Sequence, residues 1–356
     1  MIRFGPAGIP LSCKGRTLKD GVEDVHNLSL SALEIQMVRA NTVIRYPEEE
    51  DIGLTIRDIP DMLAVEILRD DEPICDPNTA IEEEDLVVCM AKGVTDSFGD
   101  LGPIGRMAKR LDVSISIHTP YYMDLGSNNE LTDRCLDGIR HAGLILNELD
   151  GAVVVTDLGL YNRQHPEDQI DENIFNNIAM LMEWWKDNGL KPKLGLEITG
   201  WQGVFGSLEQ VLDICEGIDG VVPVVNFPHY HSRTSGSLMD PADFTALLEA
   251  VEPYCNGNIH TIFAGVEHLD GNERRLTPIK RGDLKFEPLA EALADMKPDA
   301  TVISSSPLLE HDAMYMRVIN ERVLSKRVAK ALRLKRKEEE AAAAAAAAAE
   351  ADDDPA

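Results

Sequence analysis

Apolar runs that carry metal-binding residue types recur along this chain, and segments with helical spacing separate them. The runs read SISIHTPYY, KLGLEITG, VVPVVNFPHYH and NIHTIFAG, and they carry in turn His118, then Glu197, then Asn226 with His229 and His231, then His260. Continuous or alternating Val, Ile and Leu is typical of buried strands, and parallel strands joined by helices place their chemistry at the carboxyl ends. A lone buried histidine is usually a core residue, but three histidines and a glutamate at equivalent points of a repeated unit are harder to assign to packing. The recurrence therefore predicts a repeated β/α fold with a functional site at one end.

The repeat extends over eight strand-plus-helix units. Strands are predicted at residues 2–4, 32–37, 114–118, 152–158, 193–198, 221–226, 258–264 and 301–305. Helices are clearest at residues 129–149, 171–188, 207–218, 241–255 and 286–296. Strands that alternate with helices pair in parallel, and eight such units predict an α/β fold of the (β/α)8 TIM barrel type. The alternative is an open doubly wound sheet, which favours a G-x-G-x-x-G loop after an early strand, and the sequence contains none.

Residues 41–98 do not fit the repeat. They contain the acidic runs PEEED, RDDE and EEED together with the apolar stretches LAVEIL and DLVVCMA. We interpret them as an acidic, partly β insertion after the second strand of a barrel that spans residues 1–337. The insertion is either a solvated element without chemistry or a surface for a protein partner.

The carboxyl-terminal residues are the second exception. A basic helix is predicted over residues 317–337, and the low-complexity segment 338–356 follows it with EEE, nine alanines and ADDDPA. Alanine has high helix propensity, but this run has no apolar face to dock, which predicts a frayed or disordered tail. The basic helix either contacts phosphates or closes the barrel with the stems of Lys and Arg lying along apolar surface.

Composition limits the class of protein and its compartment. The chain has 356 residues, and its net charge of −28 disfavours unaided binding to nucleic acid, because phosphate attraction supplies most of that affinity. The acid reflects either a salt-rich cytoplasm or its concentration in the two segments outside the repeat. Without an apolar run of membrane-spanning length or a signal-like start, we expect a cytoplasmic protein with no membrane partner. Six cysteines without a C-x-x-C pair argue against disulfides and thiolate zinc sites, so nitrogen and oxygen would hold any metal.

Several motifs together resemble one enzyme family. HTPYYMDL, LGLEITG, NFPHYHSR, GVEHLDGNERRLTPIK and SSSPLLEHDA occur in an order and strand placement that resemble the endonuclease IV family of class II apurinic/apyrimidinic endonucleases. This family lies within the wider xylose-isomerase-like barrels. The resemblance covers roughly residues 1–40 and 99–320, and it implies a zinc-dependent phosphodiesterase that cleaves DNA 5′ of abasic sites.

The resemblance also implies metal ligands. The family holds three zinc ions, and the matching positions here are His118, Asp157, Glu197, Asn226, His229, His260 and Glu273. Asp157 stands where a histidine is usual, Asn226 and Ser305 replace carboxylates, and Leu276 replaces a further histidine. A neutral amide and a hydroxyl are weak ligands, so one or two Zn²⁺ ions are expected rather than three.

Roles for other residues follow from the same resemblance. Glu197 is expected to be the catalytic residue that bridges or orients the metal. Arg39 and Tyr121 follow strands at points where the family inserts side chains into DNA to stabilise a nucleotide turned out of the stack, and His231 is assigned with them to the substrate. Packing at strand ends is the alternative explanation for Tyr and Arg.

Three functions therefore remain open. The first is a zinc-dependent phosphodiesterase that acts on DNA with abasic sites. The second is a barrel without catalytic activity that acts as a binding or scaffold protein, with the acidic insertion as its partner surface. The third is a metal-dependent enzyme on a small phosphorylated or sugar substrate, which the acidic composition also permits.

Overall fold

The computed structural model describes residues 1–38, 42–90, 94–162 and 164–352, with side chains up to residue 342. Eight parallel strands form the central sheet in the order β1-β16-β13-β12-β10-β8-β7-β2. They are β1 (Ile2–Pro6), β2 (Ala32–Gln36), β7 (Ser114–His118), β8 (Val153–Thr156), β10 (Lys193–Glu197), β12 (Val221–Asn226), β13 (Ile259–Phe263) and β16 (Ala300–Ser304). A parallel bridge between Ala7 and Glu34 joins the two end strands. The predicted eight-stranded barrel is therefore confirmed, with each strand at its predicted position.

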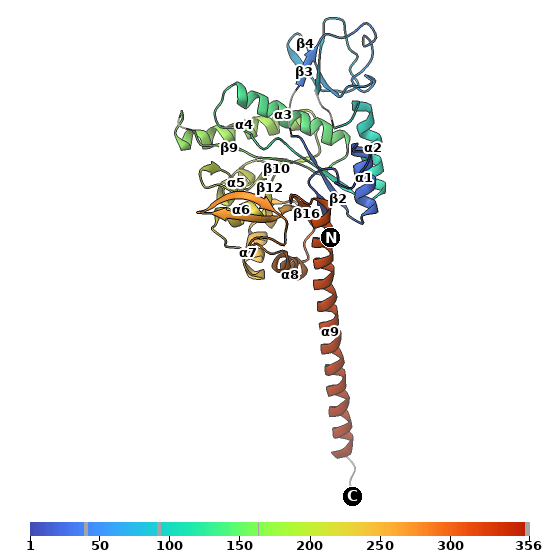
Figure 1. Cartoon of the computed structure of the whole chain (residues 1–356), viewed down its shortest axis with the longest axis vertical. Helices are drawn as coiled ribbons and strands as arrows, with labels where there is room; N and C mark the ends of the chain where they lie inside the picture. Colours follow the sequence, from blue (N-terminus) through green and yellow to red (C-terminus); the bar gives the residue numbers. More distant parts are fainter. Residues whose placement is uncertain (39–41, 91–93, 163, 353–356) are drawn as a thin grey trace.

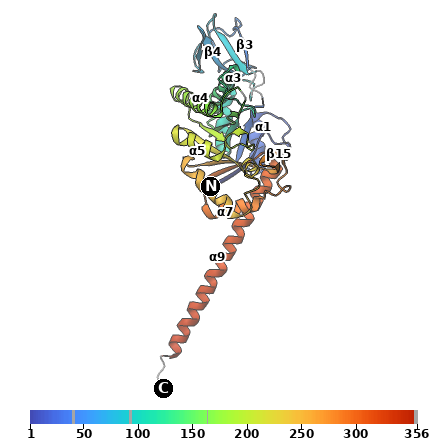
Figure 2. The same ribbon diagram turned by 90° about the vertical axis from the view of Figure 1, so that its left-hand side faces the viewer.

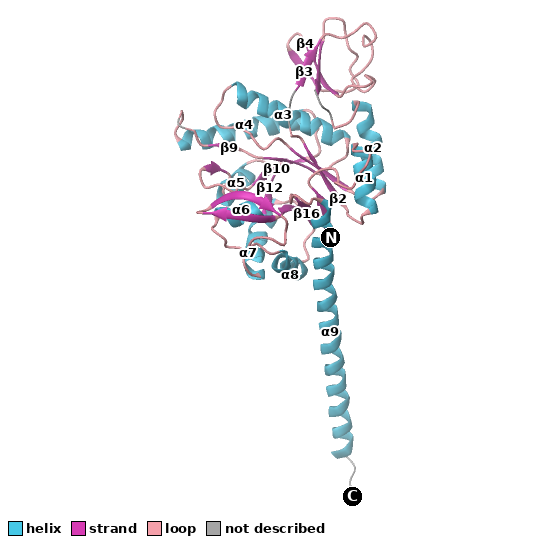
Figure 3. Ribbon diagram, viewed as in Figure 1, coloured by secondary structure: helices cyan, strands magenta, loops and turns pink. Residues whose placement is uncertain are grey.

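Helices surround this sheet (Figure 1, Figure 3). They are α1 (Leu18–Asn27), α2 (Leu101–Arg110), α3 (Glu130–Glu148), α4 (Glu167–Asp187), α5 (Leu208–Gly217), α6 (Phe227–Arg233), α7 (Pro241–Val251), α8 (Phe286–Met296) and α9 (Glu310–Asp352), with short 3-10 helices at Phe98–Asp100 and Glu252–Tyr254. Side chains of Asn129, Ser207 and Asp240 accept backbone N–H groups at the starts of α3, α5 and α7. Capping of this kind fixes where a helix begins.

The barrel has an apolar interior that ends below the strand tips. Side chains of alternate residues point inwards, because successive residues of a strand face opposite sides of a sheet. The inward-facing apolar residues form one cluster, which consists of Ala32, Val153, Val155, Val222, Val224, Ile262 and Ile303. Continuing the same alternation, the next inward positions are occupied by Glu34, His118, Glu197 and Asn226, which are all buried. Polar groups therefore replace the apolar core at the carboxyl ends of the strands.

The insertion after β2 is a separate antiparallel sheet, which lies beyond α2 and α3 in Figure 1. Its strands are β3 (Thr42–Arg45), β4 (Ala64–Arg69), β5 (Glu72–Ile74) and β6 (Leu86–Met90), in the order β3-β6-β4-β5. Arg57 donates two hydrogen bonds to Glu148 of α3, at 2.6 and 2.8 Å, which fasten the insertion to the barrel. The insertion is partly β, as the sequence predicts.

The carboxyl-terminal segment differs from the prediction. Helix α9 continues through the alanine run to Asp352, where the sequence analysis expects a frayed or disordered tail. The high helix propensity of alanine supports this helix, and so do ion pairs such as Arg336–Glu340 one turn apart. The helix also extends away from the barrel in both views, instead of lying along it (Figure 1, Figure 2). Met316 is fully buried, whereas Leu332 is 63% exposed, so only the first turns of α9 pack against the barrel.

The loops at the carboxyl ends of the strands contain two small antiparallel sheets. One pairs β9 (Gly159–Leu160) with β11 (Val204–Phe205), and the other is a hairpin of β14 (Gly265–Leu269) and β15 (Asn272–Thr277). The hairpin packs against α6, which begins directly after β12. Among the described residues, no helix has an apolar stretch of the length needed to span a bilayer.

Candidate active site

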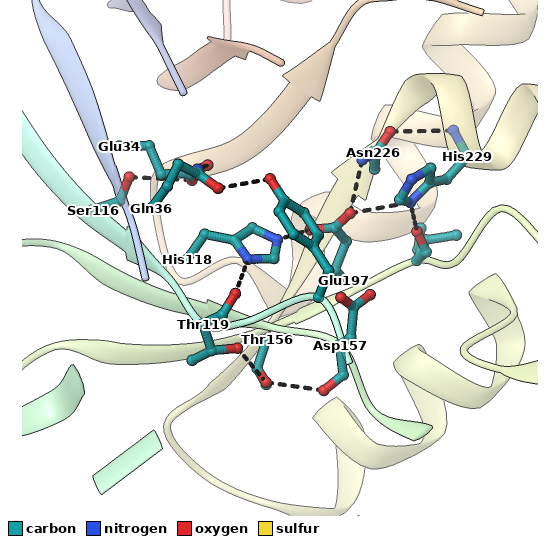
Figure 4. Close-up of polar contacts among 12 residues, drawn as sticks. Glu34, Gln36, Ser116, His118, Thr119, Thr156, Asp157, Glu197, Asn226 and His229 are labelled. Carbon is teal, nitrogen blue, oxygen red and sulfur yellow. Dashed lines mark hydrogen bonds and ion pairs between the residues drawn. The ribbon is translucent and has the colours of Figure 1, made fainter. Parts of the chain in front are cut away.

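Three strands end on residues that meet in one buried cluster. His118 ends β7, Glu197 ends β10 and Asn226 ends β12, and each is at most 3% exposed. His229 joins them from the first turn of α6, because that helix starts immediately after Asn226 (Figure 4). The structure thus brings together four of the residues that the sequence analysis assigns to a metal site.

Glu197 is the centre of this cluster. His118 Nε2 donates to Glu197 Oε2 at 2.7 Å, and Asn226 Nδ2 donates to Glu197 Oε1 at 2.7 Å. His229 Nδ1 lies 3.0 Å from the same Oε1 and 3.0 Å from the carbonyl oxygen of Ile198. Both oxygens of this buried carboxylate are therefore paired, as a buried charge requires.

The charges of the cluster stabilise one another. Burial lowers the pKa of His118, but the charge of Glu197 and its hydrogen bond outweigh burial and raise it to about 10. The pKa of His229 rises to about 9 because the hydrogen bond and charge of Glu197 also exceed the effect of burial. Burial raises the pKa of Glu197, but the two histidines hold it well below its usual range. Without metal, the cluster therefore consists of an ionised glutamate between two imidazolium rings.

Asp157 supplies a second carboxylate beside the cluster. It follows Thr156, the last residue of β8, and β8 lies between β7 and β10 in the sheet. Burial and the neighbouring charge of Glu197 raise the pKa of Asp157 to about 7. The site thus combines one carboxylate that stays ionised with another that exchanges its proton near neutral pH, an arrangement typical of acid–base catalysis.

A further carboxylate approaches His229 from the β14–β15 hairpin. Glu273 Oε2 lies 3.3 Å from His229 Nε2, and the backbone N–H of Glu273 donates to the carbonyl oxygen of Gly200 at 2.9 Å. Burial raises the pKa of Glu273. Its Oε2 atom is buried, and its contact with His229 Nε2 lacks good hydrogen-bond geometry. In the metal-free protein the protonated ring of His229 is therefore the cation beside this carboxylate.

His260 pairs with a carboxylate that the sequence analysis misses. Its Nε2 lies 3.0 Å from Glu34 Oε2, while Gln36 Nε2 donates to Glu34 Oε1 at 2.9 Å. His260 is the second residue of β13, so it lies inside the barrel below the strand ends, and its partner there is Glu34 instead of Glu197. Glu34 is the one acidic residue in the strand ALEIQ, and that isolated charge in an apolar strand is the signal that could have identified it.

The residues predicted to contact the substrate lie in different parts of the structure. Tyr121 is 59% exposed, its ring centroid lies 4.7 Å from that of His118, and its hydroxyl donates to Gln36 Oε1 at 2.6 Å. His231, in contrast, is fully buried, because it lies two positions beyond His229 on α6 and so faces the other side of that helix. The structure therefore keeps Tyr121 at the opening of the site and removes His231 from it. Arg39 lies outside the described residues.

Asn226 holds the cluster together, although the sequence analysis assigns it to the metal. Its Nδ2 group donates to Glu197, and its Oδ1 accepts the backbone N–H of His229 at 3.1 Å as the cap of α6. Both ends of the amide are thus occupied. An aspartate here would place a second negative charge against Glu197, and the amide avoids that repulsion. Ser305, where the resemblance implies a carboxylate, has a buried hydroxyl without a partner among the described residues.

The remaining side chains of the central cluster are of the types that bind divalent metals. His118 Nδ1 donates to the carbonyl oxygen of Thr119 at 2.6 Å, which directs Nε2 towards Glu197, and His229 likewise directs Nε2 towards Glu273. A ring nitrogen fixed by a backbone carbonyl is the usual support of a metal-binding histidine. Imidazole and carboxylate ligands suit zinc and related ions.

Comparison with known proteins agrees with this architecture. The family model described as xylose isomerase-like TIM barrel matches residues 99–310, and the chain belongs to that family. An uncharacterized protein of Methanocaldococcus jannaschii is 29% identical over 216 residues, which are 59% of this chain and 78% of the relative.

Solved structures share the same fold at low identity. A D-tagatose 3-epimerase-like protein has a TM-score of 0.57 and 19% identity, with 88% of this chain and 96% of that chain covered. An L-ribulose 3-epimerase has a TM-score of 0.56 at 13% identity and covers 94% and 98% of the two chains. Endonuclease IV from Thermus thermophilus has a TM-score of 0.56 at 15% identity and covers 90% and 98%. The predicted resemblance is thus correct for the wider xylose isomerase-like family, and solved structures with this fold are sugar epimerases as well as an endonuclease.

Proposed function

We propose that this chain is a divalent-metal-dependent enzyme that performs acid–base chemistry on a small, sugar-like substrate at the carboxyl ends of the barrel strands. The observation that carries the proposal is the pair of carboxylates at the ends of neighbouring strands, buried Glu197 and partly buried Asp157, whose pKa values are shifted in opposite directions. Moving a proton to and from a hydroxylated carbon requires a group that titrates near neutral pH. Several similar structures are epimerases of sugars, which supports this substrate class.

The metal would be held by His118 and Glu197, with Asp157 beside them. When bound, a divalent ion polarises a carbonyl or hydroxyl oxygen of the substrate. His118 Nε2 must lose its proton to act as a ligand, so metal binding competes with the histidine–glutamate pair and weakens as pH falls.

The side chains of the site each have a distinct role in this reaction. Asp157 accepts and returns a proton, and a bound ion beside it would lower its pKa from the metal-free value of about 7. Glu197 stays ionised between its partners, and Asn226 keeps its carboxylate fixed. The half-exposed ring of Tyr121 lies against His118 and limits the access of water. The net charge of −28 favours an uncharged substrate over a polyanion.

A second candidate is the zinc-dependent phosphodiesterase that acts on abasic DNA. The observation that favours it is the second pair, His229 Nε2 and Glu273 Oε2 at 3.3 Å, which offers ligands for another ion close to the first. Two neighbouring metal ions suit the hydrolysis of phosphodiesters. The net charge of −28 disfavours this candidate, because DNA must approach an acidic protein.

One experiment separates these functions. Metal-loaded protein is incubated with a panel of ketoses and aldoses in D₂O, and exchange of carbon-bound hydrogen is measured by mass spectrometry. In parallel, the same protein is incubated with an abasic DNA duplex. We expect metal-dependent exchange with at least one sugar, loss of exchange in Glu197→Gln and Asp157→Asn, and no nicking above background. Nicking without exchange would establish the phosphodiesterase, and neither activity in a protein whose stability ignores chelators would establish a non-catalytic barrel.

A further inference from the structure

A second group of metal-binding side chains lies on the other face of α6. His231 of α6, His268 of β14 and Asp283, which follows β15, place their ligand atoms within 4.8 Å of one another. His231 Nε2 lies 3.3 Å from Asp283 Oδ1, and His268 Nε2 lies 3.2 Å from Asp283 Oδ2. The two rings are nearly perpendicular, with centroids 5.0 Å apart. Three elements therefore direct two imidazole nitrogens and a carboxylate to one point.

The state of His231 indicates that this group lacks a ligand. The side chain is fully buried, and its Nε2 atom meets Asp283 Oδ1 at 3.3 Å in a contact that lacks good hydrogen-bond geometry. Buried polar nitrogens usually make a well-formed hydrogen bond, so this poor contact requires an explanation. A bound metal ion would provide it.

The backbone beside the group is irregular. The pairing of β14 with β15 shifts register between Glu267 and His268, and such a bulge redirects the side chain that follows it. Gly236, at φ +90°, borders the group, and a Cβ atom there would lie 3.5 to 3.8 Å from atoms of His268 and Asp283. A Cβ atom at this position would thus be in ordinary van der Waals contact with the two ligands.

We propose that His231, His268 and Asp283 bind a divalent ion of the zinc class, with water at the fourth position. Two histidines, one carboxylate and one water are a common zinc ligand set. The site is distinct from the one around Glu197, and the proposal does not depend on the proposed function. The ion fastens the β14–β15 hairpin to α6. Since the hairpin carries Glu273 and α6 carries His229, the outer ion sets the distance between those two residues.

One existing hydrogen bond of His231 would be lost when the metal ion binds. The backbone N–H of Leu238 donates to His231 Nδ1 at 3.2 Å, which places the ring proton on Nε2. Ligation through Nε2 moves that proton to Nδ1, and Leu238 then loses its acceptor. A long, neutral hydrogen bond is worth much less than a metal–ligand bond, so metal binding outweighs this loss. The residues that precede α7 must shift slightly when the ion binds.

Zinc stoichiometry tests the proposal. The full-length chain is freed of metal with a chelator, equilibrated with ZnCl₂ and analysed for bound zinc and melting temperature. We expect His268→Ala and Asp283→Asn each to bind one ion fewer than the wild type and to lose part of the zinc-induced rise in melting temperature. His311→Ala is the matched control, because His311 is 61% exposed and lies outside the group. Equal stoichiometry in the wild type and both variants would overturn the proposal.

A second measurement distinguishes the two sites and remains valid if His268→Ala folds poorly. Hydrogen exchange of the amides of residues 265–277 is followed with and without zinc in the wild type, in His118→Ala and in Asp283→Asn. We expect zinc to slow exchange in the hairpin of the wild type and of His118→Ala, but not of Asp283→Asn. Protection that disappears in His118→Ala and persists in Asp283→Asn would assign the ion to the central cluster and refute the outer site.

Discussion

Helix α6 separates two clusters built from the same residue types but in different states. The cluster around Glu197 is closed, since both carboxylate oxygens accept hydrogen bonds and both neighbouring histidines are held by backbone carbonyls. The cluster of His231, His268 and Asp283 is open, because among the described residues buried His231 Nε2 has only a poorly aligned contact with Asp283, at 3.3 Å. The first cluster is stable without metal and must give up protons to bind a metal ion. The second would gain better contacts from the ion proposed above.

The largest expected effect comes from removing the central charge. Glu197→Gln leaves two buried imidazolium rings without their counter-ion, and breaking a buried pair in this way costs about 3–5 kcal/mol. Urea unfolding of the chelator-treated protein measures this loss. Asp283→Asn, the equivalent change in the open cluster, removes a carboxylate that is 50% exposed and should cost less than about 1 kcal/mol without metal. Equal losses in the two variants would contradict the distinction between a closed and an open cluster.

The pH dependence of stability is the next test of the closed cluster. In the metal-free fold the pKa of His118 is about 10 and that of His229 about 9, both above the ordinary 6.5. Their protonation therefore stabilises the fold fully below pH 6.5, and this stabilisation is lost as pH rises through 9 and 10. Melting temperatures of chelator-treated protein should fall over that window.

Asp157 makes the stability of the fold depend on pH in a second, lower range. Its folded pKa of about 7 exceeds the ordinary 3.8, so the folded state holds this proton more tightly and stability declines as pH rises from about 4 to 7. Asp157→Asn should abolish the decline in stability between about pH 4 and 7 and leave the decline at high pH unchanged. If the melting temperature of Asp157→Asn still falls in both pH ranges, Asp157 does not titrate in the lower range.

The substitution Asn226→Asp should convert the closed cluster towards an open one. It replaces the donor to Glu197 Oε1 by a second carboxylate, so the metal-free protein should lose about 1–3 kcal/mol. Aspartate still caps α6, which preserves the helix. The added ligand should tighten zinc binding about tenfold or more, as measured by calorimetry. A stability loss without tighter binding would indicate that the metal does not approach this position.

The strand pattern predicts the barrel and the tops of its strands, because apolar runs and their polar ends are local features. His118, Glu197 and Asn226 are identified in this way. The partner of His260 is not, because Glu34 is 226 positions away in the sequence and only the closed sheet brings the two strands together. The separation of His229 from His231 also escapes prediction, since it requires that a helix begin immediately after β12.

The carboxyl-terminal segment shows another limit of the sequence. Low complexity predicts disorder when no apolar face can dock, yet alanine and ion pairs one turn apart support a helix without a docking surface. The two arguments compete within one segment, and the composition alone does not decide between them.

The smallest expected effect concerns the opening of the closed cluster. Tyr121→Phe removes the hydroxyl that donates to Gln36 Oε1, so it should cost about 0.5–1.5 kcal/mol of stability. The ring remains against His118, and Gln36 still donates to Glu34. The rate at which the enzyme exchanges carbon-bound hydrogen of the sugar in D₂O should therefore fall only slightly. Tyr121→Ala, which also uncovers His118, should lower this rate further. The neighbouring Tyr122, which is 62% exposed, provides the control variant Tyr122→Phe. If Tyr121→Phe loses as much activity as Tyr121→Ala, the hydroxyl contributes to the reaction and the ring does not act only as a cover.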